Sequence, residues 1–264
     1  LFDAARPYEG RFELLGSAAH RALAREAVRK SLVLLKNDGV LPIKASARVL
    51  VIGSAANSIG AQSGGWSISW QGADTSNADF PNGESIYSGI KAAIEAGGGS
   101  MLPGSGETTE PSLVDARPDV AVVVYGENPY AEFFGDIKSA LYFPTQSLET
   151  LRRLRRLGIP VVSVFLSGRP LWANPELNAS NAFVAAWLPG TEGGGVADIL
   201  VGDGAGRPRT DFTGKLSFPW PVNAAQAAHR AGHASGPVPF PVGYGLNYAQ
   251  RGAVRQLPED FVGP

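Results

Sequence analysis

Asp119-Val-Ala-Val-Val-Val-Tyr125 is a continuous apolar run of strand length, and the polar, turn-forming segment Gly126-Glu-Asn-Pro-Tyr-Ala-Glu132 follows it directly. Strands of a parallel sheet are covered on both faces, so nearly all of their side chains are apolar. The run therefore predicts a strand inside a parallel sheet, with a shaped loop at its carboxyl end.

Segments of the same kind lie before and after this run, separated by helical patterns. We expect further strands at 31–36, 48–53, 159–166 and 182–187 and a short one near Met101. Apolar residues at helical spacing predict helices at 17–30, with Ser17 as the N-cap, and at 84–96, 146–157 and 196–201. Because strands and helices alternate, right-handed crossovers predict an α/β fold: a doubly wound, mostly parallel sheet with helices on both faces and long loops at the strand carboxyl ends.

The composition restricts the classes of partner. The 264 residues carry a net charge of −1 and 18% charged residues, so no basic field favours nucleic acid or an anionic membrane surface. No apolar run approaches the roughly 20 residues of a membrane helix. The chain has no cysteine, which excludes disulfides, thiolate metal ligands and thiol nucleophiles. We therefore expect a neutral partner, and neither nucleic acid nor membrane.

The polar residues with potential chemistry follow the expected strands. In an open parallel sheet, ligands bind outside the carboxyl ends of the strands. The loop after Gly53 contains Trp66 and Trp70, the loop after Tyr125 contains the carboxylates Glu127, Glu132 and Asp136, and the loop after Leu166 contains Arg169. Tryptophan rings beside carboxylates favour a carbohydrate site, because sugar C–H faces lie on the rings and carboxylates handle the glycosidic oxygen.

The residues alone leave several of these roles open. A tryptophan is more often a core residue than a sugar platform, so a structural role is favoured for Trp66, and both roles stay open for Trp70. A carboxylate in a polar loop is usually only solvated, and spacing does not choose among Glu127, Glu132 and Asp136.

Other chemistries lack their motifs. No G-x-G-x-x-G or phosphate loop follows a strand, so no nucleotide cofactor is expected. His20, His229 and His233 lack metal-ligand spacing, and there is no G-x-S-x-G elbow, so neither a metal site nor a serine hydrolase is expected.

Taken together and in order, the motifs resemble those of the C-terminal α/β-sandwich domain of glycoside hydrolase family 3, in its β-glucosidase and exo-β-glucanase branch. The matching segments are Ala24–Asn37, Gly65-Trp-Ser-Ile-Ser-Trp-Gln-Gly72, Gly126–Glu132 with Gly135-Asp136, Ser167-Gly-Arg-Pro170, Ala186–Gly195 and Val242–Tyr248.

The resemblance implies a role for individual residues. Glu132 matches the acid/base glutamate of a retaining mechanism, whose aspartate nucleophile lies in a separate N-terminal (β/α)8 barrel. Trp70 looks like the tryptophan that lines the aglycone subsite, with Trp66 beside it. Glu127, Asp136 and Arg169 would support the loops. The substrate implied is a β-glucoside or β-glucan oligosaccharide, without a cofactor or metal.

The resemblance also implies a domain organisation. The chain begins Leu1-Phe-Asp3 and contains only one methionine, Met101, so we expect a piece of a longer polypeptide. We assign 1–16 to a linker from the barrel, 17–248 to the α/β-sandwich domain and 249–264 to a tail or linker. The substrate class favours the periplasm or secretion. The alternatives are a non-catalytic carbohydrate-binding α/β module and, with less support, a nucleotide-dependent α/β enzyme.

Overall fold

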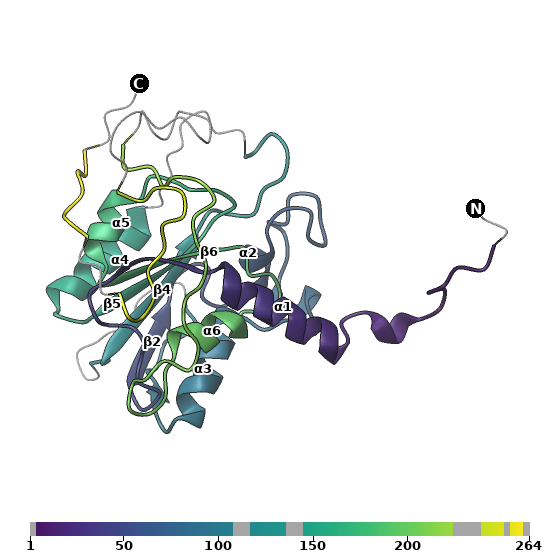
Figure 1. Cartoon of the computed structure of the whole chain (residues 1–264), viewed down its shortest axis with the longest axis horizontal. Coiled ribbons are helices and arrows are strands. Elements are labelled where there is room, and N and C mark those ends of the chain that lie inside the picture. The colour runs from purple at the N-terminus through teal and green to yellow at the C-terminus, as the bar shows by residue number, and fades with distance from the viewer. Residues whose placement is uncertain (1–3, 108–116, 136–144, 224–238, 251–253, 261–264) are drawn as a thin grey trace.

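The computed structural model describes residues 4–107, 117–135, 145–223, 239–250 and 254–260 (Figure 1). These residues form one six-stranded sheet in the order β1-β6-β5-β4-β2-β3. Its strands are β1 (Val33–Asn37), β2 (Arg48–Ile52), β3 (Ser100–Met101), β4 (Val120–Gly126), β5 (Val161–Leu166) and β6 (Ala182–Trp187). Strands β2 to β6 pair in parallel, and β1 runs antiparallel to β6 at one edge. The expected α/β class with a mostly parallel sheet is confirmed.

Helices cover both faces of the sheet. On one face lie α1 (Ala18–Ser31), α3 (Ile86–Ala96) and α6 (Gly194–Leu200), and on the other lie α4 (Thr145–Arg156) and α5 (Asn174–Ala179) (Figure 1). Strand β4 shows why its sequence is continuously apolar: Val122 and Val124 pack into the first layer, whereas Val123 and Tyr125 pack into the second.

The helix and strand boundaries agree with expectation within about two residues, apart from four short helices. Ser17 caps α1 by accepting a hydrogen bond from the His20 N–H. The unexpected α-helices are α2 (Ile59–Ser63) and α5, and two short 3-10 helices, η1 (Phe12–Leu14) and η2 (Asn77–Asp79), were also not expected. Both α-helices are too short to display a helical apolar period, although Pro175 in the first turn of α5 is a residue type typical of helix starts.

The two ends of the described chain differ in packing. Residues 4–16 are exposed, except for the partly buried Leu14, and extend away from the sheet (Figure 1). In contrast, the segment 254–260 packs against α5, where Leu257 is buried and exchanges hydrogen bonds with the Asn178 side chain. Residues 254–260, expected to belong to a tail or linker, thus contact the domain.

Candidate active site

The site lies where the winding of the sheet changes direction. From β2 the chain passes through α3 to β3 on one side, and the next strand, β4, pairs with β2 on its other side. The carboxyl ends of β2 and β4 are therefore adjacent, and the long loops that follow them meet there. At Gly65 the two loops approach so closely that a Cβ atom would lie 2.0 Å from the Tyr130 carbonyl oxygen.

Glu132 and Trp70 are brought together by these loops. The Trp70 indole N–H donates a hydrogen bond of 2.5 Å to Oε2 of Glu132. Gln71 fixes the same contact from the backbone side: its Oε1 accepts the Ala131 N–H at 2.8 Å, and its Nε2 donates to the Glu132 carbonyl at 3.4 Å. Two residues 62 positions apart in sequence are thus held in direct contact.

The Glu132 carboxylate is exposed, and its charged form is favoured. The Trp70 indole N–H is the main cause, and it holds the pKa of Glu132 below the usual value for a glutamate. Burial in a cleft between domains would raise this pKa. On this chain the pKa of Glu132 is instead lowered, because Trp70 donates a hydrogen bond to the carboxylate and the carboxylate is exposed.

Aromatic side chains surround the pair and are largely exposed. The exposed fractions are 69% for Trp66, 46% for Trp70 and 74% for Phe133. The ring centroids of Trp66 and Trp70 are 6.3 Å apart, and Phe133 meets Trp70 edge to face at 6.2 Å. Trp66 is therefore not a core residue.

The backbone around these rings adopts an uncommon conformation. Trp66, Ile68 and Phe133 have positive φ angles of 61°, 68° and 72°, a region that costs free energy for residues with a Cβ atom. These turns direct large apolar side chains outward rather than into the core.

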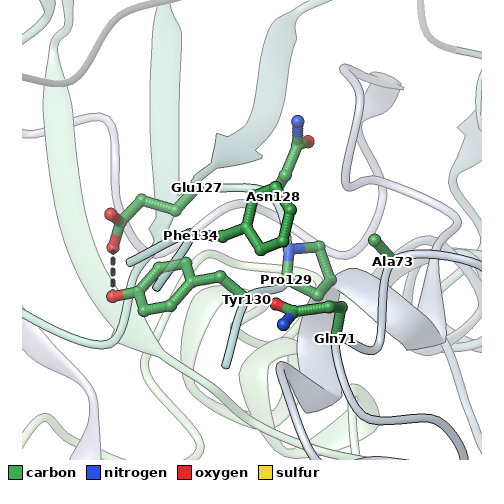
Figure 2. Close-up of a pocket in the computed structure, with 7 residues that line it drawn as sticks. All are labelled: Gln71, Ala73, Glu127, Asn128, Pro129, Tyr130 and Phe134. Carbon is green, nitrogen blue, oxygen red and sulfur yellow. Dashed lines mark hydrogen bonds between the residues drawn. The ribbon is translucent and has the colours of Figure 1, made fainter. Parts of the chain in front are cut away.

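A polar network holds the loop after β4. Nε and Nη2 of Arg169 donate to Oε1 of Glu127 at 3.1 and 2.8 Å, and Nη1 donates to the Gly135 carbonyl at 2.9 Å. The Tyr130 hydroxyl donates to the other Glu127 oxygen at 3.3 Å, as Figure 2 shows, and the guanidinium lies 5.2 Å from the Tyr130 ring centroid. Burial is the first cause that raises the pKa of Tyr130, so its hydroxyl keeps the proton that it donates.

The structure thus brings together Glu132, Trp70 and Trp66, and it places Glu127 and Arg169 in one network behind them. Asp136 lies outside the described residues. Sequence reasoning gave no role to Gln71 or Tyr130. The sequence offered one signal for each of these roles: Gln71 follows Trp70 directly, and Tyr130 lies between Glu127 and Glu132.

Two classes of feature are missing from the described part of the chain. Within it, no three His, Asp or Glu side chains gather in a way that could hold a metal ion. No helix in the same ranges combines the length and apolar character that crossing a bilayer requires.

Comparisons with known proteins agree with this architecture. The model of the glycosyl hydrolase family 3 C-terminal domain matches residues 32–248. A lysosomal beta glucosidase of Dictyostelium discoideum is 34% identical over 207 residues, which is 72% of this chain and 25% of that protein. A periplasmic beta-glucosidase of Salmonella typhimurium is 28% identical and is matched over 88% of this chain and 35% of its own length.

Solved structures show the same fold. The exo-1,3/1,4-beta-glucanase of a Pseudoalteromonas species superposes with a TM-score of 0.91 and 52% identity, covering 97% of this chain and 32% of that one. The beta-glucosidase of Listeria innocua in complex with isofagomine gives a TM-score of 0.71 at 25% identity, covering 94% of this chain and 36% of its own. The chain spans about a quarter to a third of the length of these relatives, and it belongs to glycosyl hydrolase family 3, of which it contains the C-terminal domain.

Proposed function

We propose that this chain is the second domain of a retaining β-glucosidase or exo-β-glucanase, in which Glu132 is the acid/base residue. The contact between Glu132 and Trp70 carries the proposal. It places an exposed carboxyl group against an exposed aromatic ring at the carboxyl edge of the sheet. A glycosidic oxygen seated over Trp70 would be within reach of that carboxyl group.

The reaction would proceed in two displacements. Glu132 donates its proton to the leaving oxygen while an aspartate of the barrel domain attacks the anomeric carbon, and the two carboxyl groups stand about 5–5.5 Å apart. The ionised Glu132 then takes a proton from the water that attacks the glycosyl-enzyme, so the anomeric configuration is retained.

The first step needs a protonated Glu132, and this requirement explains why the domain would not act alone. On this chain the Trp70 N–H and free access to water both favour the carboxylate. A second domain and a bound sugar would remove water from the carboxyl group, and desolvation raises the pKa of an acid. The exposed aromatic surface of Trp66, Trp70 and Phe133 is where such a cover would lie.

The names of several relatives support a β-glucoside substrate. Beta-glucosidases and an exo-1,3/1,4-beta-glucanase match this chain, and a Listeria innocua relative was solved with laminaribiose. We infer that the intact protein releases terminal glucosyl units from β-glucan oligosaccharides, with Trp70 contacting the leaving-group sugar and Trp66 beside it. The similarity to a periplasmic enzyme favours export from the cytoplasm.

The test uses the intact protein and the substitution Glu132→Gln. We expect hydrolysis of disaccharides, which have poor leaving groups, to slow by about 10²–10⁴-fold. Formation of the glycosyl-enzyme from activated aryl glucosides should be nearly unaffected, because these leaving groups need no proton. Pre-steady-state bursts and steady-state rates separate the two steps.

A second variant and a control complete the test. With Glu132→Ala, added azide should replace water in the second step and yield a β-glucosyl azide, since azide needs no general base. Glu95→Gln, an exposed glutamate on α3, serves as the control and should match the wild type. Equal loss on both substrate kinds, or no loss, contradicts the acid/base role; no loss would favour a non-catalytic carbohydrate-binding domain.

A further inference from the structure

We propose that a groove beside the Glu132 loop binds glucosyl units on the leaving-group side of a neutral β-linked oligosaccharide, beyond the unit that Trp70 contacts. The inference rests on the proposed function and extends it to chain length. We call this hollow the loop groove; it lies between Gln71–Ala73 and Glu127–Phe134 and measures about 500 Å³ (Figure 2).

The size and walls of the loop groove suit a sugar. Small-molecule sites commonly measure about 300–1,000 Å³. One wall comes from Gln71 and Ala73 of the loop after α2, and the other comes from Asn128, Tyr130 and Phe134 of the loop after β4. The two loops that hold Trp70 and Glu132 therefore also form the loop groove.

The side chains in the loop groove match a pyranose in kind. Phe134 is 74% exposed and offers an apolar face for sugar C–H groups. Asn128 is exposed, and its carboxamide has no hydrogen bond to any other described residue, so both its donors and its acceptor are available to hydroxyl groups. An aromatic face with a free amide beside it binds a ligand that is apolar on one side and rich in hydroxyls on the other.

The charge of the loop groove selects a neutral ligand. Glu127 supplies the one carboxylate among its lining residues, and that carboxylate is paired with Arg169 and accepts the Tyr130 hydroxyl. Among the described residues, the lining therefore presents no uncompensated charge to a phosphate, a carboxylate or an amine.

The position of the loop groove continues the proposed substrate path. Gln71 follows Trp70 directly and contacts the backbone of Ala131 and Glu132, so the groove begins where the Trp70 platform ends. It adjoins a smaller hollow of about 140 Å³, with Ala73 and Asn128 in the walls of both. Ser54 and Ser58 line that hollow at the carboxyl end of β2, where ligands of doubly wound sheets bind.

The experiment measures kinetics of the intact protein on a series of β-1,3-linked substrates: an aryl β-glucoside, laminaribiose, laminaritriose and laminaritetraose. For Phe134→Ala and for Asn128→Ala we expect kcat/KM on the trisaccharide and tetrasaccharide to fall about fivefold to tenfold, mostly through KM. The aryl glucoside and the disaccharide should be unchanged. Phe218→Ala, which removes an exposed phenylalanine that is not among the lining residues, should leave all four substrates unchanged.

Two outcomes overturn the proposal. Equal kcat/KM values for wild type and both variants on the longer substrates would show that no sugar occupies the loop groove. An equal loss on all four substrates would show that the groove instead supports the Glu132 loop or is covered by another part of the protein. Glu132→Gln in the same assay separates the two hypotheses: if it slows laminaribiose while Phe134→Ala has no effect, only the loop groove is wrong.

Discussion

Two glutamates of this chain lie in opposite surroundings. Glu132 is exposed at the carboxyl edge of the sheet, and the Trp70 indole N–H holds its pKa below the usual value. Glu176 in α5 is fully buried, and neither of its carboxylate oxygens has a hydrogen-bond partner among the described residues. Burial raises the pKa of Glu176 to about 8. The same side chain is therefore biased toward the charged form at one site and toward the neutral form at the other.

This difference shows that a raised carboxyl pKa and the proposed functional site do not coincide in this chain. A raised carboxyl pKa often marks an active site, yet here it marks a buried residue of α5, while the proposed acid/base residue has a lowered one. Glu132 is assigned by its position at the switch point and by its aromatic neighbours. The pKa that matters for its chemistry is set only when a sugar and a second domain cover it.

The largest effect expected from this comparison concerns Glu176→Gln. Below pH about 4.5 the carboxyl group is neutral in both the folded and the unfolded chain. Between about 4.5 and 8 the unfolded chain releases the proton and the folded chain keeps it, so stability falls as pH rises. The total difference is on the order of 5 kcal/mol, and it is complete above pH about 8.

Urea unfolding of wild type and Glu176→Gln at pH 5 and pH 9 checks this expectation. The variant should lose less stability than the wild type between the two pH values, because its amide does not ionise. Glu149→Gln on the neighbouring α4, an exposed position, should follow the wild type. If wild type and Glu176→Gln lost equal stability between pH 5 and pH 9, Glu176 would not titrate in that range.

A smaller effect is expected from the network behind the Glu132 loop. Arg169→Met leaves the Glu127 carboxylate, whose side chain is 7% exposed, without its ion pair, and we expect a loss of about 2–3 kcal/mol in the free energy of unfolding. In the double variant Arg169→Met with Glu127→Gln, no unpaired charge remains, so part of the loss should be recovered. If the loss in the double variant equalled the sum of the losses in Arg169→Met and in Glu127→Gln measured separately, the two residues would not be coupled.

The sequence predicts the sheet better than it predicts the site contacts. Strand β4 is recognisable because both of its faces are buried, so its local composition reports the tertiary structure. Helix α1 is recognisable from its cap and apolar stripe. Helices α2 and α5 are missed because five or six residues contain too little periodicity.

The site contacts depend on pairing between distant loops. Glu132 and Trp70 could be named from their motifs, but their hydrogen bond depends on β2 and β4 being neighbours. Likewise, Glu127 meets Arg169 only because β4 pairs with β5. Glu176 shows the converse: nothing in its local sequence indicates that a glutamate there is fully buried.

The smallest expected effect tests the Glu132 side of the comparison directly. Trp70→Phe keeps an aromatic ring but removes the indole N–H, which is the first cause that lowers the pKa of Glu132, so the pKa should rise toward the usual glutamate value. A ¹³C NMR titration of the side-chain carboxyl carbon of Glu132 measures this midpoint. Trp66→Phe is the matched control, because its indole contributes least to the lowering, and it should shift the midpoint less. If the two variants gave equal midpoints, the Trp70 hydrogen bond would not be what keeps Glu132 ionised, and burial alone would distinguish the two glutamates.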